Sequence, residues 1–439
     1  MSAAISVVPA VGLLDTPRHI VLSGFAPGEH VSLTARSRQA DGSAWRSVNT
    51  YVADARGAID LDRQAPVSGS YAGVDGQGPI WSQAWLPQPG EDSLAVPAPE
   101  GLAGAITVVL QAQGEHGARA TANLVQRHAA EGVVRTPLSQ DGLVGALFTP
   151  ATPGPHPAIV FLNGSGGGVN EARAALFASH GYAALALGYF GAPGLPDHLS
   201  GIPLEYFERA LAWLRATVRP AWDFVAVSGI SRGGELSLLL GSEYPQAVSA
   251  VVAYVPSSVV HGVLNAGKPE EGRFATAWTR GGDAVAHVWE GNAAQDWSAI
   301  DSLPEPRRQA QAFVDAQRDV AAVARARIPV ERIAGPVLLL SAGDDGYWPS
   351  SRYAEDVART LTRAQHPHAV THLDYPEAGH ALQAPGVPTT RIAKPHPVSG
   401  IVLTGGGTPL ANHRANQASW AGVLDFLKDA VAARARQAA

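Results

Sequence analysis

The chain has 439 residues, of which 46% are hydrophobic and 16% are charged, and its formal net charge is −6. This length and composition predict a folded protein with a sizeable core and room for two domains. A negative chain without basic clusters is not expected to bind nucleic acid. The lack of cysteine excludes disulfides, cysteine-ligated zinc and a thiol nucleophile.

The first sixteen residues are apolar, but no Lys or Arg precedes their short apolar run, so we expect no secretory signal. No stretch approaches the length of uninterrupted apolar sequence that a membrane-spanning helix needs. These features and the absence of cysteine favour a cytoplasmic protein without a membrane span. They leave the oligomeric state open.

Residues 1–131 have the pattern of an all-β domain. Short segments rich in β-branched residues alternate with turn signals such as Ala26-Pro27-Gly28 and Asp41-Gly42. Six or seven such strands favour an immunoglobulin-like β-sandwich. Residues 68–78 are polar and glycine-rich, which indicates a long loop. The expected strands are 19–23, 31–37, 45–52, 58–61, 105–111 and 118–124.

From residue 132 onward, strands alternate with helices, which is typical of a parallel sheet with crossover helices. Residues 158–162 form a continuous apolar run, as expected of a strand that is buried on both faces. We therefore expect an α/β domain over 132–439. Further strands are expected at 182–187, from Phe224, and at 248–255, 335–341 and 369–375, and helices at 171–180, 204–217, 233–243, 351–363 and 420–434.

An insertion at about 256–334 interrupts this alternation. It contains Trp278, Trp289 and Trp297 and a polar helix expected at about 305–324. Insertions at this place in such sheets lie over the carboxyl edge, where pockets form. The insertion is therefore expected to be either a lid or pocket wall, or a peripheral excursion whose tryptophans pack on the sheet.

The most informative motif is Gly-x-Ser-x-Gly at Gly229, Ser231 and Gly233, between a buried strand and a helix. A serine on such a tight turn is exposed at the carboxyl edge of the sheet, and the glycines allow the strand and helix to approach closely. A serine hydroxyl is a weak nucleophile at neutral pH, so it needs a histidine base held by a carboxylate.

Candidates for both partners follow later strands. Asp344 and Asp345 come directly after the strand that ends at Ser341, and His380 follows the strand that ends at Tyr375. This is the chain order of an α/β-hydrolase triad. We predict Ser231, Asp345 and His380 as the catalytic residues. Asp344 is the alternative acid, although its position favours capping the turn.

The oxyanion site is expected to use the backbone amide of Arg232 and a second amide, from Gly164 or Ser165. These two residues belong to the glycine-rich loop 163–168, which follows a buried strand. A phosphate-binding loop is the competing interpretation, but the loop lacks both glycine spacings that such loops require.

His366, His368 and His372 resemble a metal-ligand cluster, but Pro367 interrupts the run and Asp374 is the acidic residue close to it. A metal site is therefore not favoured there. We expect neither a metal nor a cofactor.

Several segments, some of them outside the catalytic motifs, resemble those of a known protein family. The chain resembles the acyl-CoA thioesterase and bile acid-CoA:amino acid N-acyltransferase family over nearly its whole length. The stretches 28–36 and 69–73 resemble the β-sandwich that precedes the hydrolase domain in that family. The segments that carry the resemblance in the second domain are 189–196, 202–208, 328–332, 344–350, 375–380, 405–413 and Trp420.

The resemblance implies that Ser231 is the nucleophile, Asp345 the acid and His380 the base of an acyl-CoA thioester hydrolase. It also implies hydrolysis rather than transfer to an amine, because conjugating members use cysteine. Three alternatives remain open: an esterase or peptidase acting on a non-CoA acyl compound, an acyl-CoA:amine N-acyltransferase, and a silent acyl-ligand binding protein. Residues 256–309 of the insertion do not match the family motifs, so the acyl group that is cleaved is not predicted.

Overall fold

A computed structural model describes residues 2–101 and 103–438. Within these residues the chain divides into two compact units. The first contains the chain up to residue 130 together with 383–391 and 412–417, and the second contains 131–382, 392–411 and the chain from 418. The sequence indicates one boundary near residue 131. It gives no sign that two later segments join the first unit.

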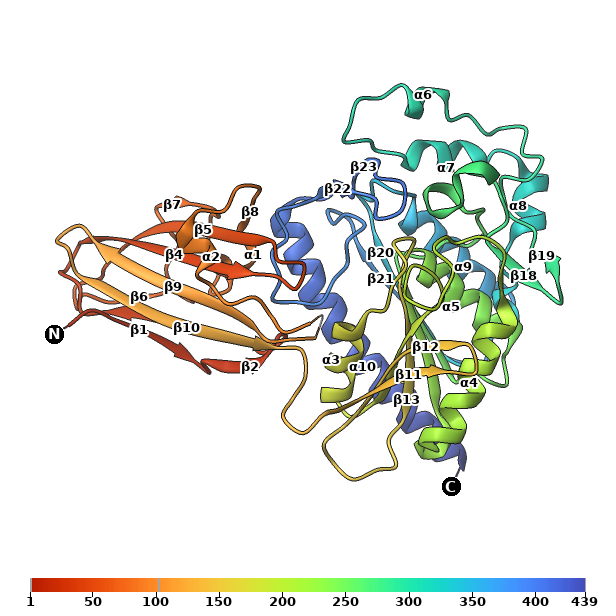
Figure 1. Cartoon of the computed structure of the whole chain (residues 1–439), viewed down its shortest axis with the longest axis horizontal. Coiled ribbons are helices and arrows are strands. Elements are labelled where there is room, and N and C mark those ends of the chain that lie inside the picture. Colours follow the sequence, from red (N-terminus) through yellow and green to blue (C-terminus); the bar gives the residue numbers. More distant parts are fainter. Residues whose placement is uncertain (1, 102, 439) are drawn as a thin grey trace. The chain divides into compact units, whose positions relative to one another are not determined.

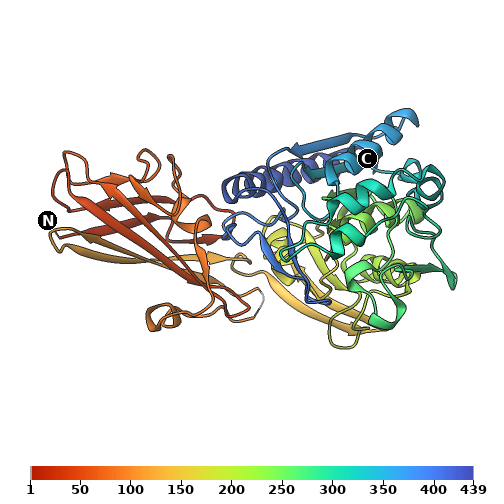
Figure 2. The same ribbon diagram turned by 90° about the horizontal axis from the view of Figure 1, so that it is seen from above.

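The first unit is a sandwich of two sheets (Figures 1 and 2). One sheet has the order β1-β3-β6, and the other has the order β2-β10-β9-β4-β5-β7, with β8 also paired to β5. Two helical turns, α1 (Gly78–Trp81) and α2 (Glu91–Leu94), accompany them. The strands are β1 (Ala4–Val8), β2 (Val11–Leu13), β3 (His19–Ser23), β4 (His30–Arg38), β5 (Ala44–Val52), β6 (Ile59–Asp60), β7 (Ser68–Gly69), β8 (Ala84–Leu86), β9 (Ile106–Gly114) and β10 (Arg119–Arg127).

Alternating burial explains why these segments form a sandwich. Along β4, the buried residues Val31, Leu33 and Ala35 alternate with partly exposed ones, so one face of the strand points inward. These side chains pack with apolar residues of β3, β9 and β10 in one core. Burial of such a face supplies most of the free energy that stabilises a sandwich.

The second unit is built on an eight-stranded sheet with the order β11-β12-β14-β13-β16-β17-β20-β21 among the described residues. The last six strands of this order run parallel, and β12 is antiparallel to both of its neighbours. The strands are β11 (Val134–Gln140), β12 (Leu143–Thr149), β13 (Ala158–Leu162), β14 (Ala183–Gly188), β16 (Val225–Ile230), β17 (Ala250–Tyr254), β20 (Val337–Ala342) and β21 (Val370–Tyr375).

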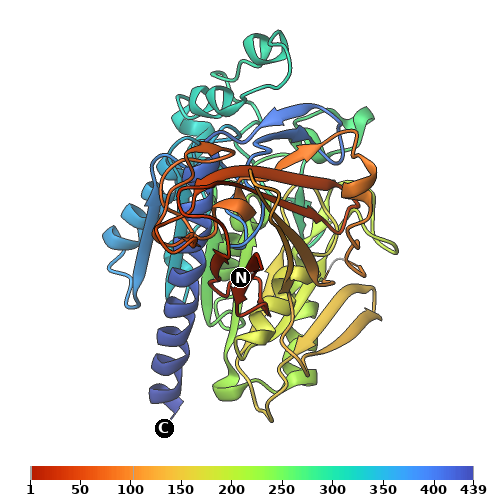
Figure 3. The ribbon, with the colours of Figure 1, turned by 90° about the vertical axis from the view of Figure 1, so that its left-hand side faces the viewer.

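Helices cover both faces of this sheet. Phe161 of β13 contacts Phe177 of α3 (Glu171–Ser179), which contacts Trp420 of α10 (Pro409–Ala438). The adjacent Val160 points to the opposite face. There it packs in a core with residues of α4 (Leu204–Val218), α5 (Arg232–Glu243) and α9 (Ser350–Arg363). Figure 3 shows α10 as a long helix that ends at the C-terminus. It begins at Pro409, well before the expected start at Trp420, and proline suits a first helical turn.

The insertion lies between β17 and β20 and is mostly irregular. Its elements are β18 (Trp278–Arg280), β19 (Asp283–Ala284), α6 (Ser298–Asp301), α7 (Ala310–Ala316) and α8 (Val320–Ala326). The prediction of a single polar helix over 305–324 is wrong. The chain breaks into α7 and α8, because the Asp319 side chain accepts a hydrogen bond from the amide of Ala322 (3.0 Å) and so caps a new helix.

Short pairings complete the second unit: β15 (Ile202–Pro203) joins β18, and β22 (Ala393–Pro395) joins β23 (Val402–Thr404). Among the helices that the structure describes, none combines the length and the apolar character needed to cross a membrane.

Candidate active site

Ser231 lies on a strained turn between β16 and α5. Its backbone has φ 58° and ψ −119°, a conformation that residues with a Cβ atom rarely adopt. A Cβ on Gly229 would lie 2.2 Å from the carbonyl oxygen of Gly233, and one on Gly233 would lie 2.4 Å from the carbonyl oxygen of Leu162. The two glycines therefore allow the strand, turn and helix to pack closely, as the motif predicts.

Asp345 and His380 form a buried pair at the ends of β20 and β21. The Nδ1 atom of His380 lies 2.9 and 2.8 Å from the two carboxylate oxygens of Asp345, and both side chains are almost completely buried. A carboxylate only accepts hydrogen bonds, so Nδ1 of His380 carries the proton. The Asp345 carboxylate is itself held by the amide of Tyr347 (2.8 Å).

The neighbouring Asp344 has different contacts. Its carboxylate accepts hydrogen bonds from the amide of Gly407 (2.7 Å) and the guanidinium of Arg308 (2.7 Å). It therefore links three loops of the second unit, and among the described residues its side chain has no hydrogen bond or ion pair with His380. The sequence places both aspartates after the same strand. Of these two residues, Asp345 is the one whose carboxylate accepts the hydrogen bond of His380.

The second nitrogen of His380 is available. Its Nε2 atom is buried and has no hydrogen-bond partner among the described residues, Ser231 included. The Tyr347 ring stacks on the imidazole with ring centroids 4.4 Å apart, and Trp348 packs on it edge-on. Tyr347, Trp348 and Ser231 line one cavity. The imidazole is thus fixed in orientation, with its unprotonated nitrogen free.

The loop 163–168 passes directly beside the serine. A Cβ on Gly164 would lie 3.3 Å from Cβ of Ser231. The hydroxyl of Tyr189 donates to the carbonyl oxygen of Asn163 (2.6 Å), which braces the loop. Arg232 is the first residue of α5, so its amide has no partner within the helix. Of the predicted oxyanion residues, Arg232 follows Ser231 directly, Gly164 packs against it, and Ser165 lines the same cavity.

The side chain of Arg232 has a second set of contacts that the sequence does not reveal. Its guanidinium donates to both carboxylate oxygens of Glu235 (2.9 Å each) and to the carbonyl oxygens of His261 (3.1 Å) and Gly262 (2.7 Å). Burial raises the pKa of Glu235, and the adjacent Arg232 opposes that rise. The buried ion pair of Arg232 and Glu235 thus connects the start of the insertion to α5, because Arg232 also donates to the two carbonyl oxygens of the insertion.

A small cavity opens at Ser231. Residues of the insertion supply one wall, so the insertion forms part of the pocket and is not merely peripheral. Its tryptophans also pack internally, Trp278 in the main core and Trp289 with Trp297 in a second one. The residues lining the cavity are Ser165, Ser231, Arg232, Val263, Leu264, Asn265, Gln309, Phe313, Tyr347, Trp348, His396 and Leu403.

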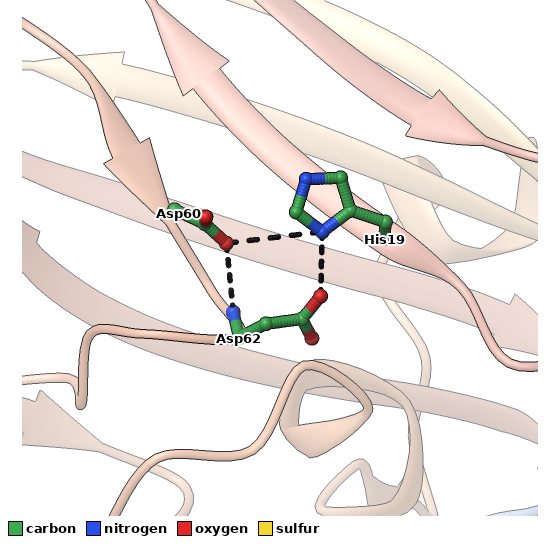
Figure 4. Close-up of side chains that lie close together, drawn as sticks. All are labelled: His19, Asp60 and Asp62. Carbon is green, nitrogen blue, oxygen red and sulfur yellow. Dashed lines mark hydrogen bonds and ion pairs between the residues drawn. The ribbon is translucent and has the colours of Figure 1, made fainter.

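The histidines of β21 and its entry do not converge on one point. His366 bonds the carbonyl oxygen of Gly335 (2.9 Å), while Nε2 of His372 lies 2.7 Å from Oγ of Ser341. Of the described residues, His19, Asp60 and Asp62 of the first unit come close enough to share an ion (Figure 4). The hydrogen bond that Nδ1 of His19 donates to the Asp62 carboxylate (2.5 Å) raises the pKa of the exposed ring, and a ring that is protonated cannot bind a metal.

A serine on a strained strand-to-helix turn, at the carboxyl edge of this sheet order, defines the second unit as an α/β-hydrolase fold. Residues 202–433 match the family model described as BAAT / Acyl-CoA thioester hydrolase C terminal, and residues 15–140 match Acyl-CoA thioester hydrolase/BAAT N-terminal region. The chain belongs to the acyl-CoA thioester hydrolase/BAAT family.

Curated relatives match over nearly the whole chain. Acyl-coenzyme A thioesterase 1 of Rattus norvegicus is 31% identical over 97% of this chain and 96% of its own length. Acyl-coenzyme A thioesterase 6 of Mus musculus is 30% identical over 98% and 97%. The mitochondrial acyl-coenzyme A thioesterase 2 of Homo sapiens is 30% identical over 94% and 81%. A solved acylaminoacyl peptidase of Pyrococcus horikoshii is 12% identical, with a TM-score of 0.42, over 94% of this chain and 59% of that one.

Proposed function

We propose that this protein hydrolyses acyl-CoA thioesters through an acyl-serine intermediate on Ser231. The observation that carries the proposal is Ser231 on its strained turn, together with His380 at the same carboxyl edge of the sheet, which donates to Asp345 and keeps its other nitrogen free. The names of the relatives support acyl-CoA as the substrate.

In the first half of the reaction, Oγ of Ser231 attacks the thioester carbonyl carbon while Nε2 of His380 takes the hydroxyl proton. Asp345 keeps the imidazole in the tautomer that can accept this proton and stabilises the imidazolium that forms. The negative charge on the carbonyl oxygen is met by the amides of Arg232 and of the loop at Gly164 or Ser165. The carbon–sulfur bond then breaks, and His380 returns the proton to the CoA sulfur.

In the second half, water takes the place of the serine. His380 removes a proton from water, the hydroxide attacks the acyl-serine carbonyl, and Ser231 leaves with the proton held by His380. The products are a free acid and the regenerated enzyme. Serine favours this outcome because its oxyester intermediate is readily hydrolysed once the base is in place.

We expect the purified protein to release free CoA thiol from at least part of a panel of short-, medium- and long-chain acyl-CoAs. Because the chain has no cysteine, a thiol reagent detects no protein background. Turnover of simple esters without CoA release across the panel would rule out the thioesterase function and favour an esterase. Amide products on addition of glycine or taurine, detected by mass spectrometry, would instead identify an acyltransferase.

Substitution of each of the two adjacent aspartates tests the assignment of Asp345 as the acid of the triad. Asp345→Asn is expected to lower kcat by about 10³-fold or more, because an amide at this place can favour the wrong tautomer of His380. Asp344→Asn should lower thermal stability and leave kcat within about threefold, since its carboxylate contacts Gly407 and Arg308 instead. Equal losses of kcat in the two variants would contradict the assignment.

The remaining expectations for the protein are also proposals. We propose an acyl-CoA as the small-molecule partner and the cytoplasm as the location. A relative of 30% identity is named as mitochondrial, so imaging of a tagged full-length chain is the appropriate check on location.

A further inference from the structure

A second histidine, His396, lies in the same cavity as Ser231 and is not part of the triad. Its Nε2 atom is 3.0 Å from Oγ of Ser165, and both residues line the cavity. Ser165 follows Gly164, the glycine that packs against the nucleophile. His396 follows β22 and is only 6% exposed. The contact between Ser165 and His396 therefore lies between the cavity and the interior of the second unit.

The contacts of His396 fix which of its nitrogens carries the proton. The amides of Val398 (3.3 Å) and Ser399 (3.4 Å) both point at Nδ1 of His396. An amide only donates, so Nδ1 must offer a lone pair, and the proton of the neutral ring lies on Nε2. Burial, with a smaller contribution from Lys394, lowers the pKa of His396 to about 4, which agrees with a neutral ring.

The two histidines of the cavity therefore have opposite tautomers. His380 carries its proton on Nδ1 and leaves Nε2 free to accept a proton. His396 carries its proton on Nε2 and uses Nδ1 as an acceptor, so it cannot take a proton from Ser231. Nε2–H of His396 donates to Oγ of Ser165. The hydroxyl proton of Ser165 is then left to donate elsewhere, and Ser165 borders the cavity.

We propose that the hydroxyl of Ser165 donates a hydrogen bond to the carbonyl oxygen of the acyl substrate as negative charge develops there, and that His396 is the positioning residue that orients this hydroxyl. The inference rests on Ser231 as the nucleophile of the proposed function. It adds a side-chain donor to the two backbone amides of the oxyanion site. Donors that are aimed in advance at the developing charge lower the barrier without a cost of reorganisation.

The test is a double-mutant cycle with Ser165→Ala and His396→Leu. Ser165→Ala is expected to lower kcat on acyl-CoA by about 10²-fold with KM nearly unchanged, because the lost contact is made mainly in the transition state. His396→Leu should lower kcat less, and His396→Gln should recover part of that loss because its amide can still donate to Ser165. In the Ser165→Ala background, His396→Leu should have no further effect on kcat.

A matched control is Ser341→Ala, which also removes a serine hydroxyl bonded to a histidine Nε2, here that of His372, outside the cavity. It should leave kcat unchanged whatever its effect on thermal unfolding. If Ser165→Ala leaves kcat unchanged, or if the effects of Ser165→Ala and His396→Leu on kcat simply add, the inference is overturned.

A second measurement separates this inference from the choice of substrate. A fluorophosphonate reagent phosphonylates an activated serine as fluoride leaves, and its phosphoryl oxygen, which gains negative charge in the transition state, occupies the oxyanion site. We expect Ser165→Ala to slow the labelling of Ser231, measured by intact-mass spectrometry, by about tenfold or more. Slower labelling in a protein without acyl-CoA turnover would refute the proposed function and support the role of Ser165. Unchanged labelling in a protein that does cleave acyl-CoA would refute the role of Ser165 alone.

Discussion

Replacing Ser231 with alanine is expected to remove acyl-CoA turnover, with kcat falling by about 10³- to 10⁶-fold. The hydroxyl oxygen of Ser231 bonds to the acyl carbon in the proposed mechanism, and the chain has no cysteine that could supply a thiol nucleophile instead. A small residual rate over water is expected from the oxyanion donors alone. The measurement is thiol release under single-turnover conditions, with circular dichroism to establish that the variant is folded.

A companion variant distinguishes loss of chemistry from loss of structure. Ser231→Gly should be as inactive as Ser231→Ala but more stable than it by about 1 kcal/mol, because glycine adopts φ 58° and ψ −119° without strain. Urea unfolding of the two variants gives this difference directly. A Ser231→Ala enzyme that keeps substantial activity would contradict the assignment of the nucleophile.

The second large effect concerns stability and involves Glu235, which is fully buried. Glu235→Ala is expected to destabilise the protein by about 3–5 kcal/mol, because the guanidinium of Arg232 remains buried without its partner. The indole of Trp278 (3.2 Å) and the amide of His261 (3.4 Å) would lose their acceptor as well. Denaturant unfolding, followed by tryptophan fluorescence and by circular dichroism, measures the loss.

The double variant Arg232→Met/Glu235→Leu is the matched control for this prediction. Replacing both charges with apolar side chains of similar size removes the unpaired charge, so most of the lost stability should return. The carbonyl oxygens of His261 and Gly262 would still lack the guanidinium that donates to them. Turnover should therefore be lower than that of the unmodified chain, because the cavity wall that follows Gly262 has lost this anchor. A Glu235→Ala protein as stable as the unmodified chain would refute the role of the pair.

Local patterns made the central part of the site predictable from the sequence. The run from Phe224 to Gly233 combines a buried strand, a tight turn and a helix start, and each feature depends on neighbouring residues only. The buried strands before Asp345 and His380 are similarly clear. Their common edge follows from the parallel order of the sheet, so the candidate residues could be placed near one another before any contact was known.

Contacts between distant segments could not be predicted in this way. The sequence favours Asp345 over Asp344 through its place in the loop and the family resemblance, whereas the contact between Asp345 and His380 depends on the exact geometry of that loop. The bond between Ser165 and His396 joins residues that are far apart in the chain, and the partners of Arg232 lie in the insertion. The hairpin of β11 and β12 is a different case. Its Asp141-Gly142 turn, with φ 54° and 74°, is a signal that the sequence offers.

The cavity is lined partly by residues at the sheet edge and partly by a segment of the insertion that the Arg232 side chain anchors. The Arg232 side chain holds the chain at His261 and Gly262, and the rim residues Val263, Leu264 and Asn265 follow immediately. In the proposed function the reaction takes place at the sheet edge, whereas the rim of the cavity formed by the insertion is a separate stretch of chain. We therefore expect that exchange of the segment beyond this anchor alters acyl preference and leaves the catalytic residues intact.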